Sequence, residues 1–247
     1  HGRVWATNGK YVLSYLEGPK SSIATVRLVD PFSGEIKLEF EGPVKQPLRK
    51  DVGRGLGRIL QDRYMVMFDT SGRLVVWDLL EGVELASHQT GEMPKLESMQ
   101  AMWVGNQILV LPSKAVIRSR GDMMTQQGET HRTVHRIIAI STESGQTNWS
   151  REFDNPWGVT IDQPFGTPVL LLARSKTIYT INRQTPEMDI ALLRLSDGET
   201  IHEELERAVS PRSTGLTTVL TVQPLQNRVR GRIDGEILLY DFGGDQP

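Results

Sequence analysis

Two histidines four residues apart are the first pattern in this chain that could do chemistry. His131 and His135 enclose the run Arg-Thr-Val. On a helix this spacing would place both imidazoles on one face, as in many metal sites. The run leads directly into Arg136-Ile-Ile-Ala-Ile140, however, which is typical of a strand. On a strand the two residues stand about 13 Å apart. Metal bonds are only about 2 Å long, so we predict no metal site here.

A glycine-rich run, Gly53-Arg-Gly-Leu-Gly57, has the look of a phosphate-binding loop. It lacks the Lys-Ser/Thr pair of a P-loop, and strand-like sequence follows it instead of a helix. No helix N-terminus is therefore expected to receive a phosphate. We interpret the run as a connection between sheets. We expect the basic residues in and around it to be solvated; they are Arg49, Lys50, Arg54, Arg58 and Arg63.

The composition excludes several classes of site. The chain contains no Cys, which rules out disulfides, thiolate metal sites and a cysteine nucleophile. It has neither a Gly-x-Ser-x-Gly elbow nor an Asp-x-Asp-x-Asp-Gly calcium loop. The 28 Lys and Arg side chains and 30 Asp and Glu side chains leave a net charge of −2, so we expect no nucleic-acid partner. No stretch of about 18 consecutive apolar residues occurs, so we expect no transmembrane segment. We predict no catalytic residue, no metal and no cofactor.

Positive charge is concentrated in one segment of this otherwise balanced chain. Positions 111 to 136 contain five Lys or Arg residues but only two acidic residues, which gives this segment a local charge of about +3. Met123 and Met124 add adaptable apolar surface. One interpretation is a solvated loop. The other is a site that attracts an acidic protein partner in a salt-dependent way, and its predicted binding residues are Arg118, Arg120, His131, Arg132, His135 and Arg136.

A repeated unit must position these residues. Each copy has a strand-like run, a second run that ends near Asp, a tight turn with Gly, and a third run. The turn glycines are separated by 48, 63, 53 and 46 residues, and they are Gly34, Gly82, Gly145, Gly198 and Gly244. A period near 50 made of short strands is typical of β-propeller blades. The longest separation contains the basic segment, which we therefore interpret as an insertion at a rim or channel mouth.

The hydrophobic pattern predicts how single strands are covered. Leu74-Val-Val-Trp77 is a continuous apolar run, which is expected where both faces of a strand are buried. Glu35 to Glu41 alternates, so Ile36, Leu38 and Phe40 should share one buried face. The stretch from Glu199 to Ala208 contains helix formers. Its place in the repeat nevertheless predicts an outer strand, and we favour the strand because tertiary context often overrides propensity.

Together these patterns predict an all-β fold, a β-propeller segment with five recognisable blades. The approximate limits of the blades are 1–46, 47–91, 92–156, 157–208 and 209–247. The fifth unit stops just after its turn glycines and has no fourth strand of its own. We therefore expect the segment to belong to a larger ring, in which residues upstream of His1 supply the missing edge strand.

The repeat pattern strand–Asp–x–x–x–Gly–strand resembles that of the pyrroloquinoline-quinone-like (PQQ-like) propellers. The resemblance is strongest from Asp69 to Gly82 and from Ile137 to Phe153. The Asp before the turn is present in three copies, as Asp30, Asp78 and Asp241, and the third copy has Ser141 there. The family's docking Trp follows the turn Gly by four residues, and only Trp149 matches it. The other copies have Leu38, Ala86 and His202 at that place.

A second resemblance is to WD repeats, because of the dipeptide Trp77-Asp78. No Gly-His dipeptide begins any of the units, so we rank this family behind the PQQ-like propellers.

The PQQ-like resemblance implies a scaffold more than an enzyme. The family includes quinoprotein alcohol dehydrogenases and the lipoprotein scaffold of the bacterial outer-membrane assembly machine. The mostly missing Trp girdle and the absent Cys pair imply the non-catalytic scaffold type, with a periplasmic or cell-envelope location. We therefore predict a protein-binding or scaffolding module, forming a C-terminal part of a longer bacterial protein. The alternatives are a propeller hydrolase, lyase or oxidoreductase with its site at the central channel, and a structural domain of a longer enzyme.

Overall fold

A computed structural model shows that the chain is all-β, as predicted. It describes residues 2–6, 10–17, 23–43, 57–69, 71–90, 96–114, 132–159, 168–180, 183–208, 219–223, 228–233 and 236–241, and within these ranges it contains strands and turns but no helix. The strands form four antiparallel sheets. The chain divides into two compact units, His1–Ala115 with Arg136–Ser150, and Val116–His135 with Arg151–Pro247.

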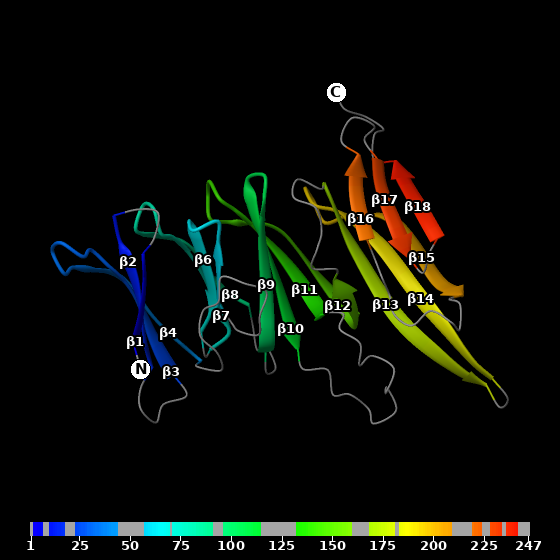
Figure 1. Cartoon of the computed structure of the whole chain (residues 1–247), viewed down its shortest axis with the longest axis horizontal. Coiled ribbons are helices and arrows are strands. Elements are labelled where there is room, and N and C mark those ends of the chain that lie inside the picture. Colours follow the sequence, from blue (N-terminus) through cyan, green and yellow to red (C-terminus); the bar gives the residue numbers. More distant parts are fainter. Residues whose placement is uncertain are drawn as a thin grey trace. The chain divides into compact units, whose positions relative to one another are not determined.

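The first unit begins with two four-stranded meanders in which the strands pair in sequence order (Figure 1). The first sheet consists of β1 (Gly2–Ala6), β2 (Val12–Glu17), β3 (Ile23–Val29) and β4 (Ile36–Pro43). The second consists of β5 (Gly57–Leu60), β6 (Tyr64–Phe68), β7 (Arg73–Asp78) and β8 (Val83–Gln89). The pairs β9–β10 and β10–β11 follow, with strands β9 (Leu96–Val104), β10 (Gln107–Lys114) and β11 (Arg132–Ser141).

The second unit continues the same antiparallel pairing. Its strands are most of β12 (Thr147–Val159), then β13 (Val169–Thr180), β14 (Arg183–Arg194) and β15 (Thr200–Ala208). A three-stranded sheet consists of β16 (Val219–Gln223), β17 (Arg228–Ile233) and β18 (Glu236–Asp241). Within this unit β12 pairs with β13, β13 with β14, and β14 with β15. The blade limit expected between 156 and 157 falls inside β12.

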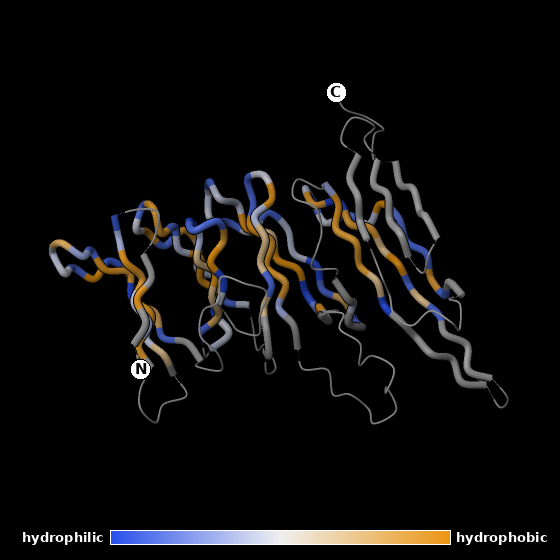
Figure 2. Tube along the Cα trace, viewed as in Figure 1, coloured by the Kyte–Doolittle hydropathy of each residue, from blue (hydrophilic) through white to orange (hydrophobic). Residues whose placement is uncertain are grey.

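Strand β7 is buried on both faces, which confirms the prediction from its continuous apolar run Leu74–Trp77. Along β7, Val75 and Trp77 enter one core with residues of the first sheet, whereas Leu74 and Val76 enter another with residues of β9–β11. Strand β6 divides its side chains between the two cores in the same way. Burial on both faces requires a neighbouring sheet on each side of the strand. Figure 2 shows runs of hydrophobic residues along strands of this unit.

Each of the two cores contains an aromatic pair that joins neighbouring sheets. Phe40 of β4 meets Trp77 of β7 edge to face at 6.2 Å between ring centroids. Tyr64 of β6 meets Trp103 of β9 at 4.9 Å in the same geometry. Edge-to-face pairs contribute about 0.5–1.5 kcal/mol beyond the area they bury, so both contacts favour the stacked arrangement of the sheets in this unit.

The repeated turn has the same geometry in four copies. Its Gly donates its N–H to the carbonyl four residues earlier at 2.8–3.0 Å, with φ between +69° and +75° at Gly34, Gly82, Gly145 and Gly198. The Asp78 carboxylate caps the turn through the N–H groups of Leu80 and Glu81. In the third copy the Ser141 hydroxyl accepts the two equivalent bonds. Ser can therefore cap this turn in place of Asp, because both offer a short side-chain acceptor. In the fourth copy Arg194 stands at this place and Gly198 keeps the same hydrogen bond, so the cap is not essential to the turn. Gly244 lies outside the described residues.

Three further expectations about side chains and strands have different outcomes. Strand β15 confirms the choice of strand over helix for the stretch that ends at Ala208. On β4, Phe40 is buried and Leu38 packs on the core, but Ile36 is 47% exposed. The expectation of a solvated Arg58 is wrong: its side chain is buried and donates to the Gly57 carbonyl. It lies in β5, inside a sheet that is covered on both faces.

Candidate binding surface

The structure describes half of the predicted binding residues. Arg118, Arg120 and His131 lie outside the described residues, and Arg132 is the first residue of β11. His135 and Arg136 are both half-buried within β11. Adjacent residues of a strand point to opposite faces of the sheet, so these two side chains do not share one surface.

Arg136 is held in place by groups from two other elements. Its Nε donates to the Ser150 hydroxyl of β12, and its Nη1 donates to the carbonyl of Thr90, which follows β8, each at 3.0 Å. Hydrogen bonds from charged donors are stronger than neutral ones. Arg136 therefore fixes the position of β11 against the chain that leaves the second sheet. It lies five residues after His131, the last residue of the basic segment outside the described ranges.

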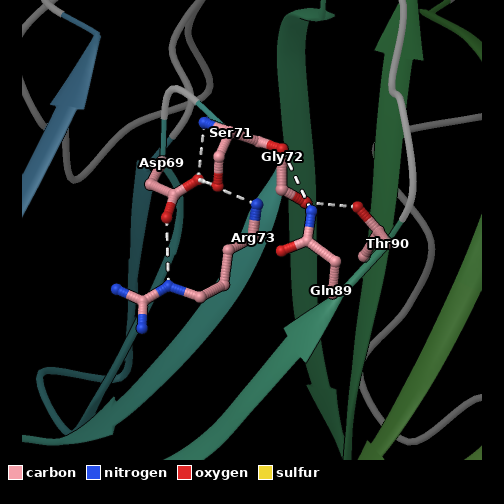
Figure 3. A network of polar contacts seen from close by, with 6 residues as sticks. All are labelled: Asp69, Ser71, Gly72, Arg73, Gln89 and Thr90. Carbon is pink, nitrogen blue, oxygen red and sulfur yellow. Dashed lines mark hydrogen bonds and ion pairs between the residues drawn. The ribbon is translucent and has the colours of Figure 1, made fainter.

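The same stretch of chain is tied to the β6–β7 hairpin. The Thr90 hydroxyl donates to the Gly72 carbonyl at 2.5 Å, and the Gln89 amide donates to the Ser71 carbonyl at 3.1 Å (Figure 3). Together with Arg136, these bonds form a continuous polar network from the hairpin to β11. The network fixes backbone positions at this end of the first unit.

Asp69 organises the hairpin within this network (Figure 3). Its Oδ1 accepts hydrogen bonds from the Ser71 N–H, the Ser71 hydroxyl and the Arg73 N–H at 2.6–2.8 Å. Its Oδ2 pairs with Arg73 Nε at 3.0 Å. Burial opposes ionisation of this carboxyl, but the bonds from Ser71 and Arg73 together outweigh it, so the pKa of Asp69 lies below its usual value. A satisfied carboxylate of this kind holds structure and has no proton to exchange near neutral pH.

Sequence reasoning missed most of this network. Asp69-Thr-Ser-Gly72 is a recognisable turn sequence, since Asp side chains cap the backbone two residues later. Thr90 and Ser150 gave no such signal, because their partners are distant in sequence and are set by sheet packing. Among the described residues, no group of three His, Asp or Glu could hold a metal ion. None of the described residues forms a helix able to span a membrane.

Comparison with known proteins gives no further assignment. No protein-family model matches the chain, and no curated protein matches it.

Replacing Asp69 with Asn should lower the free energy of unfolding at neutral pH by about 1.5–3 kcal/mol, the range for hydrogen bonds to charged groups. The folded-state pKa of Asp69 lies below its unfolded value of about 3.9. The ionised carboxylate therefore stabilises the fold fully above that pH, and this stabilisation is lost as the pH falls through the folded-state pKa. The stability difference between wild type and variant, measured by urea unfolding, should therefore shrink below about pH 4.

The control for this experiment is Glu143→Gln, which removes an exposed acid from a turn. It should change stability little at any pH. A difference between wild type and the Asp69 variant that stays constant down to strongly acidic pH would contradict the role assigned to the carboxylate.

Proposed function

We propose that this chain is a segment of a PQQ-like β-propeller that serves as a non-catalytic protein-binding scaffold. In this proposal the sheets are blades of a larger ring. The basic segment 111–136 is the surface that receives an acidic partner protein, through Arg118, Arg120, Arg132 and their neighbours.

The observation that carries the proposal is the repeated docking of one sheet's turn on the sheet before it. A Cβ placed on Gly82 would lie 2.6 Å from the ring of Tyr11, the residue just before β2. A Cβ placed on Gly145 would meet the carbonyl of Leu85 in β8. In both cases a turn glycine lies directly against the preceding sheet. Regular stacking through equivalent turns is what propeller blades require.

A second observation supports a role for the basic segment. Arg136, next to its C-terminal end, is anchored by Thr90 and Ser150, and the polar network of Figure 3 connects that anchor to the hairpin at Asp69. Binding loops are effective when a rigid scaffold positions them, because less conformational entropy is lost on association. The anchored β11 would supply such a base.

The test compares partner recovery by wild type and by a variant with Arg118, Arg120 and Arg132 replaced by Ser. Arg136 is left intact because its hydrogen bonds hold the fold. In capture from the native lysate followed by binding measurements with the recovered protein, affinity should fall at least about tenfold at low salt, since several charge pairs are lost. The loss should be smaller at high salt, where wild-type attraction is screened.

The matched control replaces Lys10, Lys37 and Arg194 with Ser. These residues are exposed and lie outside the basic segment, and their removal changes the net charge by the same amount. Full binding by this control with weak binding by the first variant would support the proposal. Equal affinity of wild type and the first variant at low salt would refute it.

A further inference from the structure

Exposed apolar side chains gather at the first two repeated turns. Among the described residues, seven large hydrophobic side chains are exposed, and four of them lie at these turns: Phe32, Ile36, Leu80 and Val83. Phe32 is 93% exposed, although aromatic residues usually bury most of their surface. Single exposed apolar residues are ordinary, but their concentration at the turns of two adjacent repeats, with Phe32 and Leu80 at equivalent places, indicates a contact surface.

The fold itself does not require apolar residues at this place in the turn. Phe32 and Leu80 both stand two residues after the capping Asp. The equivalent residues in the third and fourth copies are Glu143 and Ser196, and those turns keep the same Gly hydrogen bond. Since Glu and Ser serve the turn equally well, backbone geometry does not explain the Phe and the Leu, and the 93% exposure of Phe32 shows that packing within the fold does not explain the Phe either.

Each of the two turns is held by hydrogen bonds from its backbone to a capping carboxylate, Asp30 in the first and Asp78 in the second. The Asp30 carboxylate accepts the Phe32 N–H at 2.9 Å and the Ser33 N–H at 3.3 Å. These bonds lower the pKa of Asp30, so the cap is charged at neutral pH. The Tyr11 ring packs against Gly82 of the second turn, and Tyr11 is near enough to Lys37, at the start of β4, to interact with it electrostatically. An apolar side chain held on such a fixed turn loses little entropy when it binds.

The charges around these residues are mainly acidic. Glu35 is paired with Lys37 at 2.6 Å. Glu81 and Glu84 are exposed. Arg63 is near enough to Glu81 to interact with it electrostatically, but it forms its ion pair with Asp78, and no ion pair among the described residues involves Glu81 or Glu84. We call Phe32, Ile36, Leu80 and Val83, together with Glu81 and Glu84, the turn surface. Its complement is a segment with apolar side chains beside Lys or Arg.

We infer that the turn surface is a second protein-binding site, which takes an apolar, basic segment of a partner protein. Phe32 is its anchor, since aromatic residues dominate the energetics of interfaces. Glu81 and Glu84 select basic partners and steer their approach. This site differs in position and in charge from the basic segment 111–136, so the chain would bind two chemically opposite partners.

The probe for this inference is a library of short random peptides displayed on phage, selected on the immobilised full chain. Selected peptides should combine Phe, Trp or Leu with Lys or Arg. Synthetic copies should bind the Phe32→Ser variant at least about tenfold more weakly, which corresponds to about 1.4 kcal/mol. The double variant Glu81→Gln with Glu84→Gln should weaken binding at low salt and have less effect at high salt.

The matched controls are Leu205→Ser, which removes another exposed apolar side chain, and Glu143→Gln with Glu203→Gln, which removes two exposed acids elsewhere. Both should bind the peptides as wild type does. Acidic consensus peptides, no enrichment at all, or unchanged binding to Phe32→Ser would each overturn the inference. Self-association of the wild type that Phe32→Ser abolishes, seen by sedimentation velocity, would also overturn it, because the occupant would then be a second copy of the chain.

Discussion

Replacing Gly145 with Ala should destabilise the first unit by about 4 kcal/mol. The residue has φ of +69°, a conformation that costs a non-glycine residue about 1–2 kcal/mol. In addition, its new Cβ would collide with the carbonyl oxygen of Leu85 in β8. That oxygen is backbone and cannot rotate aside, so the sheets would have to separate, and overpacking typically costs about 1–3 kcal/mol. The measurement is urea unfolding followed by tryptophan fluorescence.

The other turn glycines provide graded controls for this prediction. Gly34 has a similar φ of +74°, but nothing lies within 4 Å of its ideal Cβ, so Gly34→Ala should cost only about 1 kcal/mol. Gly82→Ala meets the Tyr11 ring, a side chain that can shift, and should have an intermediate effect. Equal losses at Gly34 and Gly145 would show that docking between the sheets contributes nothing beyond local strain.

The sequence predicted those features of the fold that depend on neighbouring residues. Turn glycines were identifiable because only Gly adopts positive φ readily and because Asp or Ser caps the turn a few residues earlier. The two-sided burial of β7 followed from its continuous apolar run. The all-β class followed from the same local signals, since they recur with a regular period along the chain.

Features that depend on distant residues could not be predicted in this way. The contact of Gly145 with Leu85 joins positions 60 residues apart, and the bond from Arg136 to Thr90 joins positions 46 apart. Burial of Arg58 likewise depends on which sheets cover β5. Each of these is decided by how sheets stack, which hydrophobic periodicity within one strand does not encode. The exposure of Phe32 could not be predicted either, because an aromatic residue is normally expected to be buried in the core.

The second large effect is expected at Asp189 in the second unit. This carboxylate is fully buried, and its Oδ2 pairs with Arg174 Nε at 2.9 Å. Its Oδ1 accepts the N–H of Glu206 at 2.9 Å. Glu206 has φ of +57°, and the pairing of β14 with β15 shifts register at Asp189. Arg174 also stacks on the ring of Trp157 at 4.7 Å. The Asp189 carboxylate therefore accepts hydrogen bonds both from the Arg174 guanidinium and from a backbone N–H in the irregular part of β15.

Asp189→Ala should lower the free energy of unfolding by about 3–5 kcal/mol, because it leaves a partly buried Arg and an N–H without their acceptor. The double variant Arg174→Met with Asp189→Leu removes both charges and should recover a large part of that loss, since apolar residues can replace a buried ion pair. Recovery should be incomplete, because the Glu206 N–H still lacks its partner. The double-mutant cycle uses Arg174→Met, Asp189→Leu and their double variant. Additive losses in it would contradict the coupling, whereas a coupling energy of about 2 kcal/mol would show that the carboxylate is retained mainly to satisfy Arg174.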